Sequence, residues 1–292
     1  MKCLTYFLGL TFFLASFSSA EEKQSTSIQR IIALSPHSVE MLFTLGVGDR
    51  IIATTKFSNF PPEAESIPRV GGYNGIQIEK ILSLNPDLII AWIDGNKIED
   101  IEKMEKLGLN VYRSKTRSLD NIPNELILFG EMLGVQASGQ NAANAFNARL
   151  EKIRTENKTK SSVRFFYQLW DEPLRAVAAG SWINSVMHAC GGANVFNDPN
   201  FDYPEVSIEN VLISSPEVFI IPSHHGTYTA GVEKWRKWPE IPAIKNNQIY
   251  FIDGDLLHRF STRILDGMDQ VCDAFDKVRA SRLGALTNLN IN

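Results

Sequence analysis

The sequence predicts an α/β protein of two lobes, each with a central parallel-type sheet flanked by helices, joined by one long inter-lobe helix. Three observations support this. Apolar strands alternate with helical patterns in both halves, a stretch beginning at Ile78 returns at Ile208, and a strand-free helical stretch lies between the halves. Strand, helix, strand order favours parallel pairing, because each connecting helix covers one face of the sheet.

In the first half, the apolar run at 31–34 predicts a strand, and Ser35-Pro36 then opens a helix that ends before Gly46. Serine is a favoured helix cap and proline suits the first helical turn, whereas glycine commonly ends a helix. The remaining elements follow the same alternation, with a loop rich in proline, glycine and aromatic residues at 57–75. We predict strands at 31–34, 51–55, 88–92 and 110–112, and helices at 35–45, at 78–84 and ending at Leu107.

The second half repeats this order. The repeat aligns Ile78-Glu79-Lys80-Ile81-Leu82 with Ile208-Glu209-Asn210-Val211-Leu212, and Tyr73 with Tyr203. A repeated strand and helix unit indicates two lobes of similar build. We predict strands at 163–168, 218–221 and 248–252, and helices at 182–189, 206–213 and 262–278.

Between the halves, apolar residues recur at helical spacing and are interrupted only from Gly134 to Gly139. Two helices are therefore expected, the second leading into the other lobe. The tail after the last helix is small and polar, which is typical of a frayed end. The predicted organisation is an N-terminal lobe at 28–120, linking helices at 121–160, a C-terminal lobe at 161–279 and a tail at 280–292.

The first twenty residues have the layout of a secretory signal peptide. Lys2 precedes an apolar run at 4–17, and the small residues Ser18-Ser19-Ala20 precede two glutamates. A short membrane anchor is the alternative, although the run is brief for a bilayer span. Once residues 1–20 are removed as a signal peptide, the mature protein is expected to be soluble and periplasmic. The chain has a net charge of −4 with no basic block, which argues against a nucleic-acid surface.

Cysteine usage agrees with export. Cys3 lies before the apolar run and is expected to leave with the signal peptide, so that Cys190 and Cys272 remain. An even pair in an oxidising compartment predicts a disulfide bond, with two buried free thiols as the alternative.

Five motifs occur in this order: Leu34-Ser35-Pro36, the loop at 57–62, the blocks at 78–82 and 85–92, and Cys190-Gly191-Gly192. Together they resemble one known family, the helical-backbone periplasmic substrate-binding proteins that serve ABC importers, and especially its cobalamin-binding branch. The resemblance covers about residues 30–278. It implies a non-enzymatic, monomeric protein that holds cobalamin (vitamin B12) as cargo between its lobes, without a cofactor, and delivers it to a membrane permease.

Aromatic side chains at loop positions suit a corrin disc edged with amides, because aromatic walls bury large apolar areas. Phe60 lies in the same loop as Phe57, and the polar residues follow the last strand. Position 57 is Phe where the family pattern has Tyr, and positions 73 and 203 are Tyr where it tends to have Trp. The resemblance implies the ligand contacts Phe57, Tyr73, Trp92, Tyr203, Asp255, Leu256, His258 and Arg259.

Other functions are compatible with parts of the sequence. A haem or ferric-siderophore binder of the same class is the main alternative. The five histidines, His37, His188, His224, His225 and His258, lack the HxH or HxxxH spacing of a metal site, although one of His37, His225 or His258 could face cobalt. No hydrolase elbow, P-loop or dinucleotide fingerprint is present, which argues against an enzyme. Asp255 and Arg259 could also simply pair with each other at a helix start.

Glu79 and Glu209 occupy equivalent positions of the repeat, each in the first turn of a predicted helix. A carboxylate there is stabilised by the helix dipole and needs no function. The family resemblance implies instead that each forms a salt bridge with an arginine of the permease, one from each lobe.

Overall fold

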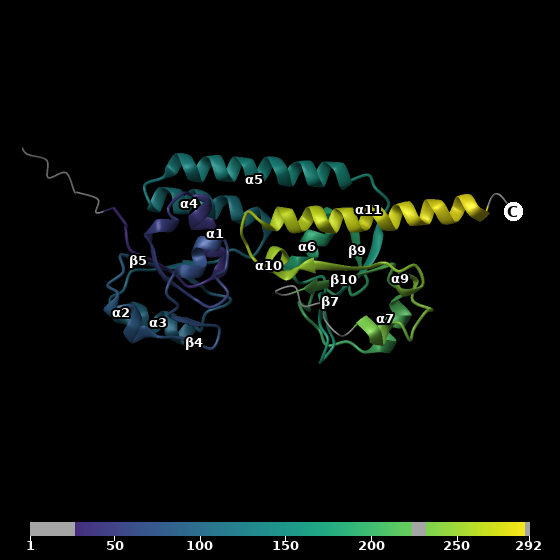
Figure 1. Ribbon diagram of the computed structural model, residues 1–292, viewed down its shortest axis with the longest axis horizontal. Coiled ribbons are helices and arrows are strands. Elements are labelled where there is room, and N and C mark those ends of the chain that lie inside the picture. The colour runs from purple at the N-terminus through teal and green to yellow at the C-terminus, as the bar shows by residue number, and fades with distance from the viewer. Residues whose placement is uncertain (1–26, 224–231, 290–292) are drawn as a thin grey trace, which may run out of the picture.

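The computed structural model describes residues 27–223 and 232–289, so the predicted signal peptide, His224 and His225 lie outside the described residues. Two lobes lie end to end along the long axis of the molecule, and one long helix passes over both (Figure 1). The predicted fold class is therefore confirmed.

The N-terminal lobe contains a four-stranded sheet in the order β2-β1-β5-β6, and all three strand pairs are parallel. A small antiparallel hairpin of β3 and β4 precedes the second helix. The strands are β1 (Ile31–Ala33), β2 (Ile51–Thr54), β3 (Gly71–Gly72), β4 (Gly75–Ile76), β5 (Leu88–Trp92) and β6 (Val111–Ser114).

The C-terminal lobe contains a five-stranded sheet in which β11, β10, β7 and β9 pair in parallel, whereas β8 pairs antiparallel with β7. The predicted repeat is visible here, because β5 and β10 are both central strands that follow equivalent helices. The strands are β7 (Val163–Trp170), β8 (Arg175–Ala176), β9 (Gly192–Asn194), β10 (Val218–Ser223) and β11 (Ile249–Asp253).

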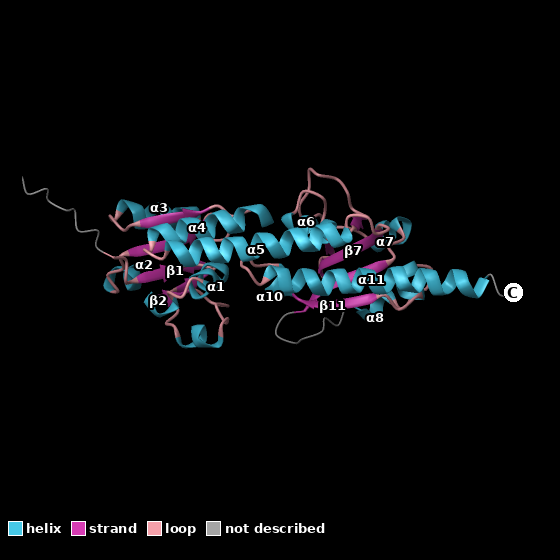
Figure 2. Ribbon diagram, turned by 90° about the horizontal axis from the view of Figure 1, so that it is seen from above, coloured by secondary structure: helices cyan, strands magenta, loops and turns pink. Residues whose placement is uncertain are grey.

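Helices cover both faces of each sheet, and seen from above α5 and α11 lie side by side over the strands (Figure 2). Local sequence explains several of their ends. Ser35 caps α1 with Pro36 in its first turn, and Ser207 forms a capping box with Asn210 at α7. The helices are α1 (Pro36–Thr44), α2 (Ile78–Ser83), α3 (Ile98–Lys106), α4 (Ile122–Met132), α5 (Gln136–Asn157), α6 (Trp182–Ala189), α7 (Ile208–Ser214), α8 (Val232–Trp235), α9 (Pro242–Lys245), α10 (Gly254–Leu257) and α11 (Ile264–Leu289).

Strand residues alternate between two cores because successive side chains point to opposite faces. In β1, Ile31 belongs to a core that continues through both lobes, whereas Ile32 belongs to a separate core of the N-terminal lobe. In β10, Ile220 lies in the shared core and Phe219 in a core of the C-terminal lobe. Strands buried on both faces explain the unbroken apolar runs in the sequence.

The link between the lobes is the predicted pair of helices. Helix α4 packs against α5, and α5 contributes Phe146, Leu150 and Ile153 to the shared core. The link is therefore a packed helix rather than a flexible linker. Among the described residues, no helix is both long and apolar enough to cross a membrane.

The last helix differs from the prediction. It begins at Ile264 and continues to Leu289. The prediction of a frayed tail from residue 280 is therefore wrong up to Leu289. The reason is tertiary. Arg282 on α11 donates to the Ser162 carbonyl at 2.9 Å and pairs with Glu217 at 2.6 Å, which holds the added turns against the C-terminal lobe.

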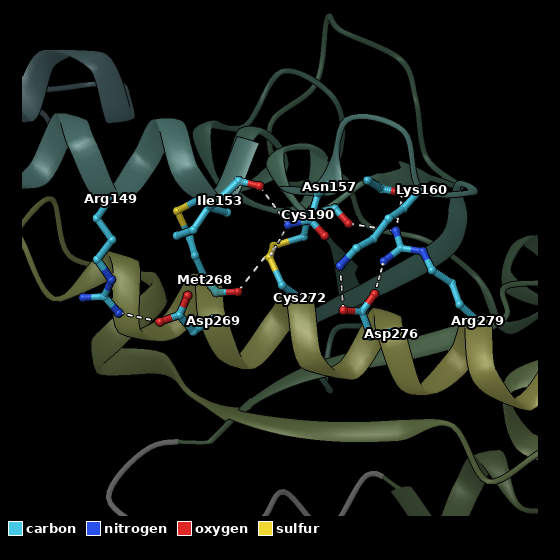
Figure 3. Close-up of a disulfide and its surroundings, with 11 residues drawn as sticks. Arg149, Ile153, Asn157, Lys160, Cys190, Met268, Asp269, Cys272, Asp276 and Arg279 are labelled. Carbon is cyan, nitrogen blue, oxygen red and sulfur yellow. Dashed lines mark hydrogen bonds and ion pairs between the residues drawn. A yellow bond between two sulfur atoms is a disulfide. The ribbon is translucent and has the colours of Figure 1, made fainter. Parts of the chain in front are cut away.

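A disulfide between Cys190 and Cys272 is present, with the two Cα atoms 4.9 Å apart. It joins the end of α6 to α11 beside the last turns of α5 (Figure 3). Gly191 has a φ of +79°, and a Cβ on Gly192 would lie 2.6 Å from the Phe275 ring, so both glycines are required by this packing. The predicted pairing is confirmed.

The disulfide predicts a measurable loss of stability when it is removed. Cys190→Ser combined with Cys272→Ser opens a link across 82 positions of sequence, which enlarges the entropy of the unfolded chain. We expect the free energy of unfolding in urea to fall by about 2–5 kcal/mol. Dithiothreitol should destabilise the wild type by a similar amount and leave the double variant unchanged. Equal stability of the two proteins would contradict a structural role for the bridge.

Glu125 gives a second prediction, for pH dependence. This residue of α4 is 4% exposed and its Oε1 has no partner among the described residues. Burial raises the pKa of the Glu125 carboxyl, although the Ser114 hydroxyl opposes the shift. A raised pKa in the folded state means that the ionised form costs stability at neutral pH, and that this cost disappears as the pH falls below the unfolded value.

Glu125→Gln is therefore expected to raise the free energy of unfolding at pH 8 by about 1 kcal/mol. The gain should vanish by about pH 4, where the wild-type carboxyl is protonated in both states. Glu131→Gln is the control, because Glu131 lies exposed on the same helix. Urea unfolding at both pH values is the measurement, and a Glu125→Gln protein less stable than wild type at pH 8 would contradict the argument.

Candidate functional site

The carboxyl end of β5 meets the C-terminal lobe at an aromatic junction. The Trp92 ring lies edge-on to His37, with centroids 5.0 Å apart, and 6.4 Å from Phe260 of the opposite lobe. Phe260 in turn contacts Trp182, with centroids 4.2 Å apart. Trp92 and Trp182 remain half-buried, so aromatic surface from both lobes lies at one place. Trp92 was a predicted contact, whereas Phe260 and Trp182 were not, because their only local signal is a position after a strand or a glycine loop.

Three aromatic side chains of the N-terminal lobe are exposed. Phe57 and Phe60 lie in the loop after β2, and Tyr73 lies at the tip of the β3–β4 hairpin. Their exposed fractions are 56%, 38% and 72% respectively. Large apolar side chains left in solvent are typical of a surface that binds a partner or ligand. This exposure is compatible with the predicted contacts Phe57 and Tyr73.

The C-terminal lobe is less symmetric than the repeat suggests. Tyr203, the counterpart of Tyr73, packs partly against the shared core, and this burial raises the pKa of its phenol. Trp170, which was not among the predicted contacts, is 60% exposed at the carboxyl end of β7. It was missed because the predicted strand ended at 168. Strand β7 continues two residues beyond that prediction, and Trp170 therefore lies at the carboxyl edge of the sheet, where ligands of open α/β sheets bind.

After β11, two of the predicted ligand contacts, Arg259 and Leu256, are buried. Arg259 has only 7% of its side chain exposed, and it pairs with Asp255 at 2.7 Å and with Glu40 of the other lobe at 2.7 Å. Leu256 is 8% exposed. A direct ligand contact through Arg259 or Leu256 therefore has little surface available in this structure, because both side chains already pack against protein. The alternative of an Asp255–Arg259 pair is present, but as a buried bridge rather than a surface one.

Asp255 and His258 keep more surface. The Asp255 side chain is 22% exposed and accepts a hydrogen bond from the Asn59 amide of the other lobe at 3.0 Å. His258 Nε2 lies 2.8 Å from the Tyr167 hydroxyl, and burial raises the pKa of that phenol. Both residues stay predicted contacts.

The histidines do not assemble a metal centre in the described part of the chain, where no group of three histidine, cysteine or acidic side chains lies together. His37 is 3% exposed, and burial, with the nearby Arg259 cation, lowers the pKa of its imidazole to about 3. It is neutral at physiological pH and covered by Trp92 and Phe260. An axial cobalt contact by His37 is therefore not available in this conformation.

A polar groove of about 850 Å³ lies elsewhere, between the end of α5 and α6. Its lining includes Arg154, Lys158 and His188 and none of the predicted contacts. Since it contains no exposed aromatic wall, it does not resemble the junction described above.

Glu79 and Glu209 lie on α2 and α7, which are on the side of the molecule away from α5 in both lobes (Figure 1). The Glu79 side chain is 85% exposed and lies 3.8 Å from Lys103, a loose pair. Glu209 differs, because its own backbone N–H and the Ser207 hydroxyl lower the pKa of its carboxyl. The helix-terminus explanation thus has support at Glu209 and less at Glu79.

Comparison with known proteins supports a relationship over most of the chain. The family described as "Periplasmic binding protein" matches residues 31–256. A vitamin B12-binding protein of Vibrio cholerae is 40% identical over 245 residues, which cover 84% of this chain and 88% of the relative. Another from Vibrio campbellii is 36% identical over 283 residues, or 97% of this chain and 100% of the relative.

Solved structures agree. The crystal structure of the periplasmic vitamin B12-binding protein BtuF of Vibrio cholerae is similar with a TM-score of 0.78 and 36% identity, covering 86% of this chain and 98% of that one. The haem-binding protein RhuT from Roseiflexus sp. RS-1 has a TM-score of 0.77 over 86% of this chain and 99% of that one, but 21% identity, which shows a common fold alone. The two-lobed fold and these matches together show that the chain belongs to the periplasmic binding protein family.

Proposed function

We propose that this protein binds cobalamin between its two lobes and delivers it to the permease of an ABC importer. The observation that carries the proposal is the aromatic junction at Trp92, Phe260 and Trp182, to which both lobes contribute. A corrin presents two broad faces that aromatic side chains can cover. Relatives that are 36–40% identical over most of the chain are named vitamin B12-binding proteins, which supports the same ligand here.

The proposal includes the setting of the protein. Residues 1–20 act as a cleaved signal peptide, and N-terminal sequencing of the exported protein tests this. The protein works as a monomer in the periplasm, and cobalamin is its cargo rather than a cofactor. No covalent chemistry is required of it, because capture and release of a ligand are binding steps.

A haem binder remains the second candidate, for a specific reason. The phenol of Tyr73 is strongly exposed, and tyrosine can ligate haem iron. Solved haem-binding proteins also share the fold. Titration of the purified protein with cyanocobalamin, haemin and a ferric hydroxamate, followed by tryptophan fluorescence, distinguishes the candidates. Quenching by cyanocobalamin supports the proposal, and binding of haemin or siderophore without cobalamin would overturn it.

The aromatic contacts are tested by truncation. Tyr73→Ala and Trp92→Ala should each weaken cyanocobalamin binding by about 1–3 kcal/mol, the usual cost of losing an aromatic anchor at an interface. Ile213→Ala is the control, because it removes an apolar side chain that is 82% exposed on α7. Isothermal titration calorimetry gives the affinities. Unchanged binding by both aromatic variants would remove Tyr73 and Trp92 from the site.

Docking is tested by charge reversal. Glu79→Arg or Glu209→Arg should leave cobalamin binding intact and lower cobalamin uptake by cells, and the double reversal should nearly abolish uptake. The reason is that exposed charges at an interface control encounter and register more than affinity. Glu156→Arg, an exposed position on α5 at the opposite side of the molecule, serves as the control. Full uptake with the double variant would leave both residues with a helix-terminus role only.

A further inference from the structure

A buried carboxylate, Glu40, joins the two lobes through charged groups. Glu40 lies on α1 of the N-terminal lobe, with 2% of its side chain exposed. Its Oε1 accepts hydrogen bonds from Arg259 at 2.7 Å and from Arg263 at 3.0 Å, and its Oε2 accepts one from the Ser261 hydroxyl. All three donors belong to the C-terminal lobe. One carboxylate thus receives three hydrogen bonds from a single segment more than 200 positions away.

The cluster is balanced in charge. Arg259 also pairs with Asp255, so two carboxylates face two guanidinium groups. Glu40 and Arg259 are both nearly inaccessible to water, and a buried charge that loses its partner is strongly unfavourable. The cluster therefore resists opening of the lobes at this point.

The charged side chains of this segment, Arg259, Asp255 and Arg263, also hold the aromatic loop of the N-terminal lobe. Arg259 donates to the Phe57 carbonyl at 3.0 Å, Asp255 accepts from Asn59 at 3.0 Å, and the Arg263 guanidinium lies 3.5 Å above the centre of the Phe60 ring. Within its own lobe the loop is held at Ser58, whose carbonyl accepts from Arg69 at 2.8 Å. The loop is consequently anchored by both lobes.

The backbone of the loop needs such anchoring. Phe57 has a φ of +68°, a left-handed conformation that a bulky side chain rarely adopts. A residue keeps this conformation only where surrounding contacts over-determine it, and such residues cluster at ligand-binding positions. The Arg259 hydrogen bond to the Phe57 carbonyl is one such contact, and Glu40 orients the arginine that makes it.

We propose that Glu40 is a positioning residue for the ligand site: through Arg259 and Arg263 it holds the loop of Phe57 and Phe60 against the C-terminal lobe before the ligand arrives. Glu40 itself does not touch the ligand. The ligand-dependent part rests on the proposed cobalamin function, whereas the state of the loop in the free protein does not. Holding the loop in place beforehand reduces the ordering cost of binding.

The main test is Glu40→Gln, which keeps the shape of the side chain and removes its charge. Hydrogen exchange of the free protein is measured on the peptide covering 55–62, in which the backbone N–H of Asn59 donates to the Phe57 carbonyl. We expect exchange there to become at least about tenfold faster, which corresponds to a loss of about 1.4 kcal/mol of local protection. The release rate of cyanocobalamin, measured in a stopped-flow chase experiment, should increase by a similar factor, with a smaller change in the association rate.

Arg149→Gln is the matched control. Arg149 forms ion pairs between α5 and α11, with Asp266 at 2.7 Å and Asp269 at 2.5 Å, but does not contact the loop at 57–60. Its exchange on peptide 55–62 and its release rate should equal those of the wild type. If Arg149→Gln loosens the loop as much as Glu40→Gln, general destabilisation explains the effect and the proposal is wrong.

Two milder variants cover the case in which Glu40→Gln does not fold. Arg263→Gln and Asn59→Ala each remove one anchor of the loop at a position that is partly exposed. Each should increase exchange on peptide 55–62 while far-UV circular dichroism stays unchanged. Wild-type exchange in every folded variant would overturn the proposal. If the wild type fails to bind cyanocobalamin, the proposed function fails, and the exchange measurement alone decides the role of Glu40.

Discussion

Both lobes depend on the geometry of parallel strands, which place all their carboxyl ends along one edge of a sheet. In the N-terminal lobe this edge ends in Trp92, and in the C-terminal lobe it continues into α10 and the segment that carries Arg259 and Phe260. The two edges meet, because Phe260 lies against Trp92 and Arg259 reaches Glu40. A junction shared by two lobes is therefore a consequence of sheet direction rather than of any single motif.

Contacts on the opposite side of the molecule keep the two sheet edges together. Helix α5 spans from one lobe to the other and contributes to a core that both lobes share, and the disulfide fastens α6 to α11 beside its end (Figure 3). Arg149 adds ion pairs from α5 to the first turns of α11. Since these pairs are partly exposed, each contributes little, and the apolar core carries most of the connection.

The junction combines two kinds of contact with different consequences. Aromatic packing between Trp92, Phe260 and Trp182 is tolerant of small shifts and leaves surface for a ligand. The charged cluster around Glu40 tolerates little, because its groups are desolvated and depend on exact partners. The aromatic contacts and the charged cluster therefore lie side by side but differ in how much displacement they tolerate. His37 contacts both the Trp92 and the Phe260 ring, and burial together with the Arg259 cation lowers the pKa of its imidazole.

The sequence alone determined the two α/β lobes, the helical link, the repeat and the Cys190–Cys272 pair, because apolar periodicity, caps and export signals are local features. The position of Trp92 at the end of an apolar strand was also predicted, and β5 ends at this residue. The tertiary structure decided what local patterns do not encode. Arg259 and Glu40 are partners 219 positions apart, so the sequence suggested a ligand contact where the fold buries an ion pair. Likewise Tyr73 and Tyr203 are equivalent in the repeat, yet one is exposed and the other packs against the core, because burial depends on neighbours that the chain brings together only on folding.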